Sequence, residues 1–129
     1  MKNEIMEVFE TYTEALLRGD FVTVFETMSD DIIWHMGGKS PLSGVIIGKQ
    51  ALEERFGEFA KRSNSTFRVV TNWAANNDCF VVASVVSLAE KDNNKLNSPG
   101  IDLFKIKDGK IQEAWTFAQY QNVEDKFWE

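Results

Sequence analysis

The sequence predicts an α+β fold in which three helices cover one face of a curved antiparallel sheet. Apolar residues recur at helical spacing in the first half of the chain, and the second half alternates between strand-like runs and polar turns. Helices that precede a meander of strands are typical of an α+β arrangement. The 129 residues suffice for one domain of ordinary size, so we expect a single domain over residues 1–129.

The elements of the first half follow from apolar spacing and capping residues. A first helix has an apolar stripe at positions i, i+3, i+4, i+7 and i+11, namely Ile5, Val8, Phe9, Tyr12 and Leu16. Gly19 ends this helix, and Asp20 is the expected N-cap of a second one. The next residues predict a short strand over 32–36, a loop over 37–44 and a third helix from about 49 to 62.

The second half predicts four long strands and a short terminal helix. The strands are expected over residues 66–75, 79–90, 96–107 and 110–121. Asp108-Gly109 between two patterned runs is a strong hairpin signal. The tail from 122 to 129 can form a helix that docks Phe127 and Trp128.

Charge and cysteine content exclude several classes of protein. The chain has 14 Lys and Arg against 20 Asp and Glu, a net charge of −6, which disfavours nucleic acid and anionic membranes as partners. It has no apolar run of the roughly 20 residues that a membrane span needs. One cysteine, Cys79, excludes an internal disulfide, and one histidine, His35, excludes a His-rich metal site. We therefore expect a cytoplasmic protein without metal or cofactor.

The strand over residues 79–88 predicts a dimer. Both of its alternating sets of residues are apolar or small, so both faces of the sheet are expected to be buried. Helices cover only one face, and a second copy of the chain is the usual cover for the other. We expect a homodimer formed through the open sheet face.

Asp102 is the first candidate site residue. Alternation places it on one face of a strand with Phe104 and Ile106, so a carboxylate lies on the more apolar side. A desolvated carboxyl has a raised pKa and can donate a hydrogen bond or act as a base. Alternatively, Asp102 is half solvated near a strand end, or bonds a neighbouring N–H group.

Three further polar residues are candidates. His35 lies beside Trp34, and imidazole is the side chain best suited to proton transfer near neutral pH. Tyr12 lies on the buried stripe of the first helix, where its hydroxyl needs a partner. Glu113 shares a strand face with Trp115 and is either a polar group in an apolar lining or a solvated edge charge. For His35 and Tyr12, the alternative is a purely structural role.

Five short motifs follow one another along the chain: Tyr12-x2-Ala15-x3-Gly19-Asp20, Met28-Ser29-Asp30-Asp31-Ile32, Pro41-Leu42-Ser43-Gly44 followed by Gly48, Gly100-Ile101-Asp102-Leu103-Phe104, and Asp108-Gly109-Lys110-Ile111-x-Glu113-x-Trp115. In this order they resemble the NTF2-like superfamily, and in particular its SnoaL-like and ketosteroid-isomerase-like branch. The resemblance implies a cone-shaped sheet packed on three helices, enclosing a mostly apolar pocket for a small ligand. Residues expected to line this pocket are Trp34, Phe104, Glu113, Trp115 and Phe117.

The same resemblance implies a catalytic site. Tyr12 and Asp102 fall on the two positions that form the oxyanion hole in the steroid-isomerase pattern. The carboxylate base of that pattern is missing, because its position falls at His35 or Met36. Either His35 replaces the base, as in an isomerase, cyclase or dehydratase acting on a small apolar carbonyl compound, or the protein is a non-catalytic ligand-binding or dimerisation module.

Overall fold

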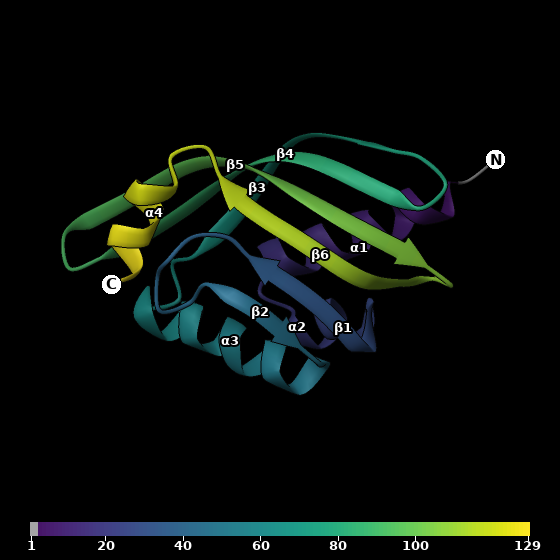
Figure 1. Cartoon of the computed structure of the whole chain (residues 1–129), viewed down its shortest axis with the longest axis horizontal. Helices are drawn as coiled ribbons and strands as arrows, with labels where there is room; N and C mark the ends of the chain where they lie inside the picture. Colours follow the sequence, from purple (N-terminus) through teal and green to yellow (C-terminus); the bar gives the residue numbers. More distant parts are fainter. Residues whose placement is uncertain (1–2) are drawn as a thin grey trace.

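The computed structural model describes residues 3–129 as helices packed on one six-stranded sheet (Figure 1). In chain order the elements are α1 (Glu4–Leu17), α2 (Phe21–Glu26), β1 (Met28–Met36), β2 (Gly44–Ile47), α3 (Lys49–Arg62), β3 (Arg68–Asn76), β4 (Phe80–Lys91), β5 (Asn94–Lys107), β6 (Lys110–Ala118) and α4 (Gln121–Trp128). The predicted α+β class, with three N-terminal helices and a curved sheet that does not close, is confirmed.

The sheet has the strand order β2-β1-β6-β5-β4-β3. All neighbouring strands are antiparallel except β1 and β6, which run parallel. Helix α1 packs on strands β3 to β6, α3 packs on β1 and β2, and α4 lies against β5 and β6. Figure 1 looks onto the face that α1 leaves uncovered.

Two predicted caps and the terminal helix occur where the sequence places them. The backbone turns at Gly19 with a φ of 73°, and the side chain of Asp20 accepts a hydrogen bond from the amide of Thr23, which starts α2. Helix α4 buries Trp128 to 1% exposure against the stacked rings of Phe59 and Phe67. This aromatic packing fixes α4 across one end of the sheet.

The structure differs from the sequence prediction around β1 and β2. Strand β1 begins at Met28 rather than Ile32, and residues 44–47 form an edge strand that the sequence analysis did not predict. Strand β2 has four residues, begins at Gly44 and is followed by Gly48, both glycines having positive φ, and only Ile46 points inward. So short a run has too few alternations to stand out from a loop.

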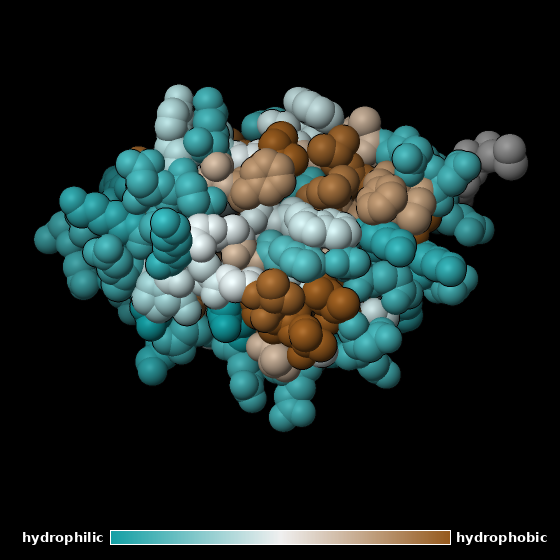
Figure 2. Space-filling view, in the orientation of Figure 1, coloured by the Kyte–Doolittle hydropathy of each residue, from teal (hydrophilic) through white to brown (hydrophobic). Residues whose placement is uncertain are grey.

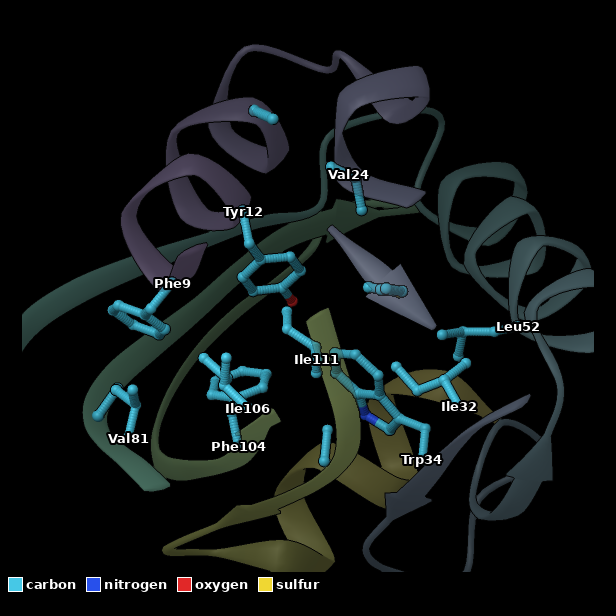
Figure 3. Packing of buried hydrophobic residues seen from close by; sticks show 14 of the residues in the cluster. Phe9, Tyr12, Val24, Ile32, Trp34, Leu52, Val81, Phe104, Ile106 and Ile111 are labelled. Carbon is cyan, nitrogen blue, oxygen red and sulfur yellow. The ribbon is translucent and has the colours of Figure 1, made fainter. Parts of the chain in front are cut away.

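Aromatic rings fill the space between α1 and the sheet (Figure 3). Phe104 on β5 is fully buried, and its ring centroid lies 5.5 Å from that of Phe9, 5.3 Å from Tyr12 and 5.8 Å from Trp34. Tyr12 extends from α1 toward the sheet, so its hydroxyl reaches the interior of the molecule. These rings form the closed end of the space that the helices and sheet enclose.

Across residues 3–129, the structure has no helix long and apolar enough to cross a membrane.

Candidate functional site

A cavity of about 260 Å³ lies between the inner face of the sheet and the helices. Its volume is close to the lower limit of about 300 Å³ for small-molecule pockets. The wall is largely aromatic, with rings from α1, α3, α4, β1 and the residue before β3: Tyr12, Trp34, Phe56, Phe59, Phe67 and Trp128. Such a wall favours a small, largely apolar ligand.

Asp102 brings a carboxyl group to this apolar cavity. Its place on β5 follows from alternation, because Asp102, Phe104 and Ile106 all point to the buried face, as predicted. Asp102 is 9% exposed and has no hydrogen-bond partner among the described residues. Burial raises the pKa of Asp102 to about 7, and the nearby charge of Glu124 adds to this shift. Below that pH the group is a neutral acid that can donate a hydrogen bond.

Tyr12 brings a hydroxyl to the same cavity from the opposite side. Its side chain is 4% exposed, and its hydroxyl has no hydrogen-bond partner within residues 3–129. Burial raises the pKa of Tyr12 well above its usual range, and the charge of Asp102 acts in the same direction. Tyr12 therefore stays a neutral phenol. Tyr12 and Asp102 therefore both bring a group that can donate a hydrogen bond to the wall of the cavity.

Glu124 is a cavity residue that the sequence analysis missed. It lies on α4, and its Oε2 accepts a hydrogen bond from the Ser98 hydroxyl of β5 at 2.7 Å. Burial raises the pKa of Glu124, and the Ser98 hydrogen bond opposes this shift. Its local sequence is that of an ordinary exposed helix, and only the docking of α4 turns it inward.

Asp125, the next residue, also lines the cavity, but its carboxylate is occupied. One oxygen accepts the amide of Lys39 at 2.9 Å, and the other accepts the side-chain amide of Gln121 at 3.0 Å. These bonds hold the loop after β1 against α4. Gly38 is required there, because its φ is 97° and a Cβ would lie 2.2 Å from Asp125.

His35 does not line the cavity, and the expectation that it serves as the base beside Tyr12 and Asp102 is corrected. Strand alternation turns Trp34 and Met36 into the cavity and His35 to the open face of the sheet. There the His35 Nε2 lies 2.7 Å from Glu113 Oε2. The imidazole ring also stacks on the indole of Trp115, with centroids 5.2 Å apart and planes 3° from parallel.

Only some of the other residues predicted to line the cavity are found there. Trp34 lines the cavity, and Phe117 borders it, although alternation turns the Phe117 side chain, which is 53% exposed, to the open face with Trp115. Glu113 and Trp115 belong to the open face with His35, and Phe104 lies within the core behind Tyr12, so these three do not line it. The cavity thus combines two of the three predicted catalytic residues with Glu124.

A metal ion has no evident site in this arrangement. Among residues 3–129, no group of three or more His, Cys, Asp or Glu side chains is placed to hold one.

Comparison with known proteins gives one family. The family model described as "SnoaL-like domain" matches residues 9–114. A solved structure from Xanthomonas campestris, described as a protein of unknown function with a cystatin-like fold, is 30% identical over 98% of each chain, with a TM-score of 0.92. Comparison with curated proteins finds no match.

More distant solved structures share the fold. An NTF2-like protein from Burkholderia xenovorans is 14% identical over 95% of each chain, with a TM-score of 0.74. A Mycobacterium tuberculosis protein, solved in complex with estradiol-17beta-hemisuccinate, is 15% identical over 90% of this chain and 94% of its own, with a TM-score of 0.77.

Proposed function

The chain belongs to the SnoaL-like domain family of the NTF2-like superfamily, and we propose that it binds a small, largely apolar carbonyl compound through the carbonyl oxygen. The observation that supports this most directly is the pairing of two unpartnered groups, the Tyr12 hydroxyl and the Asp102 carboxyl, in one apolar cavity. Buried polar groups are nearly always hydrogen-bonded, so two unpartnered groups that face one apolar cavity favour a ligand that bonds to them.

The same pair supports acid–base catalysis as the activity. When a proton leaves the carbon beside a carbonyl, negative charge develops on the oxygen. Donors fixed at that oxygen stabilise the charge, by on the order of 3 kcal/mol each. A neutral Asp102 and a neutral Tyr12 are such donors at the wall of a largely apolar cavity. Isomerisation, cyclisation and dehydration all proceed through this kind of intermediate and need no cofactor.

A non-catalytic binding module is the second candidate. It is supported by the position of His35, which contacts Glu113 on the opposite side of the sheet and is out of reach of a ligand in the cavity. The binding role is common to both candidates. The Mycobacterium tuberculosis relative, whose complex contains a steroid hemisuccinate, supports a ligand with a rigid apolar body.

Binding of 2-naphthol compared with naphthalene tests the proposed oxygen site. Tyr12→Phe removes one hydrogen-bond donor, so we expect the variant to bind 2-naphthol roughly tenfold more weakly and naphthalene as tightly as the wild type does. Quenching of tryptophan fluorescence measures both affinities. Tyr120→Phe is the matched control, because Tyr120 is 57% exposed and does not line the cavity. Equal loss of both ligands, or no loss of naphthol, contradicts an oxygen site at Tyr12.

We also propose that the protein acts in the cytoplasm as a homodimer joined through the open sheet face. That face exposes large apolar side chains from both edges and the centre of the sheet: Val45, Ile47, Val70, Trp73 and Phe117 (Figure 2). Apolar patches of this kind on a soluble protein usually mark an interface. The single free cysteine is consistent with a reducing compartment.

Light scattering at micromolar concentration should give twice the chain mass of 14.7 kDa. Ile47→Lys, which puts a charge on the apolar face, should shift the mass toward that of one chain. Val22→Lys, on α2 and equally exposed, should leave it unchanged. A wild-type mass of one chain would show that this face has no second copy on it.

A further inference from the structure

Strand β5 lines the cavity with three alternate residues, Ser98, Gly100 and Asp102. Four residues at about 3.3 Å each place the Cα atoms of Ser98 and Asp102 about 13 Å apart along the strand. Asp102 presents its own carboxyl group, and the Ser98 hydroxyl holds the Glu124 carboxylate at 2.7 Å. Strand β5 therefore carries the carboxyl group of Asp102 itself and holds that of Glu124 through Ser98, farther along the same wall of the cavity.

Between these two carboxyl groups, β5 has no side chain that projects into the cavity. Gly100 lies at the centre of this stretch, and a Cβ there would be 2.5 Å from the carbonyl oxygen of Phe117, so only glycine fits. No side chain of β5 separates Asp102 from Glu124. A flat molecule can lie along this stretch with one end at Asp102 and Tyr12 and its edge toward Glu124.

The surroundings of the two carboxyl groups give them different roles. Asp102 accepts no hydrogen bond from the described residues, whereas the Ser98 hydroxyl stabilises the charged form of Glu124. The charge of Glu124 in turn favours the protonated form of Asp102. The other ionisable groups along the cavity are Tyr12, Asp125 and Arg68, and Arg68 donates to the carbonyls of Ser65 and Phe67. Of the two carboxyl groups, Asp102 is therefore the better proton holder and Glu124 the better proton acceptor.

We propose that Glu124 is the catalytic base of this site and that its substrates are apolar ketones with an acidic C–H group one or more bonds from the carbonyl. This inference rests on the proposed function, because it takes the carbonyl oxygen to lie at Tyr12 and Asp102. Glu124 thereby fills the role that sequence reasoning gave to His35.

The proton transfer balances without another reactant. The Glu124 carboxylate removes a proton from the acidic carbon, and the C–H electron pair forms a carbon–carbon double bond. The carbonyl π electrons move to the oxygen, where Asp102 and Tyr12 donate hydrogen bonds. Glu124 then returns its proton to the same carbon, which exchanges hydrogen with solvent, or to a conjugated carbon, which isomerises the ketone.

Hydrogen–deuterium exchange of 2-tetralone in D₂O tests the inference, with loss of the α-proton NMR signals as the readout. We expect the wild-type protein to accelerate exchange and Glu124→Gln to lose about 100-fold of that acceleration. Glutamine can still accept the Ser98 hydrogen bond, so binding of 2-tetralone should change little. Glu113→Gln, the same change on the open face, should exchange at the wild-type rate.

Chemical rescue separates a base from a merely structural residue. Formate added to Glu124→Ala should restore part of the exchange rate, because a small carboxylate can enter the space left by the side chain. Tyr12-dependent binding of 2-tetralone without accelerated exchange, or full activity in Glu124→Gln, overturns the assignment of Glu124 and leaves the proposed binding function intact. Lack of any Tyr12-dependent binding overturns both.

Discussion

Asp102→Asn is expected to stabilise the folded protein at alkaline pH by as much as about 4 kcal/mol. The pKa of Asp102 rises from 3.8 to about 7 on folding, so the folded chain keeps a proton that the unfolded chain releases. Each pKa unit corresponds to about 1.4 kcal/mol. The wild-type free energy of unfolding therefore falls between pH 4 and pH 7 and is constant above. Asparagine has the shape of the acid and no charge to bury.

Urea unfolding of both proteins at pH 4 and at pH 8.5 measures this difference. The two should be nearly equal in stability at pH 4, and the variant should be more stable at pH 8.5. Asp31→Asn is the control, because Asp31 is exposed on β1 and should give no comparable gain. A stability difference that is the same at both pH values would show that Asp102 is not buried as a neutral acid. A gain at pH 8.5 also shows that the native protein keeps a destabilising group at this position, as functional sites commonly do.

Phe104→Ala is expected to cost about 3–5 kcal/mol of stability, the usual range for a buried phenylalanine. Phe104 has no exposed surface, and it touches three rings from two elements, those of Phe9 and Tyr12 on α1 and of Trp34 on β1. Loss of the ring leaves a void among groups that cannot all move to fill it.

Chemical denaturation gives the free energy of unfolding, and Phe21→Ala provides the comparison. Phe21 is 42% exposed on α2, so its loss should cost at most about 1 kcal/mol. Equal effects of the two substitutions would contradict the assignment of Phe104 to the core. Since Tyr12 rests on Phe104, the variant should also bind 2-naphthol more weakly wherever it remains folded.

Local sequence patterns were sufficient to predict the class of fold and two residues of the candidate site, Tyr12 and Asp102. Strands β4 and β5 have clear alternation, and this period places Asp102 and Phe104 on one face. The same rule puts Ile33 and His35 on one face of β1 but does not tell which face of that strand points inward. The direction depends on α3 and β6, which pack against β1 from distant parts of the chain.

Glu124 and β2 were beyond the reach of local patterns for other reasons. Glu124 lies on a short helix, where neighbouring charged residues hide its inward position, and its burial depends on Ser98 and on the docking of Trp128. Strand β2 pairs with β1 over only four residues. Phe104 was expected to line the cavity and lies in the core instead. Alternation places its ring on the buried face of the strand, but a ring there can fill the core as easily as it can line a cavity.

The parallel pairing of β1 with β6 has a consequence for how the chain folds during synthesis. His35 and Glu113, which meet across these strands, are 78 residues apart in sequence. On the ribosome β1 emerges early and must wait, with one edge unpaired, until the last strand is made. Contacts of such long range are slow to form. The nascent first half is therefore the stage at which this protein is most exposed to aggregation and in most need of a chaperone.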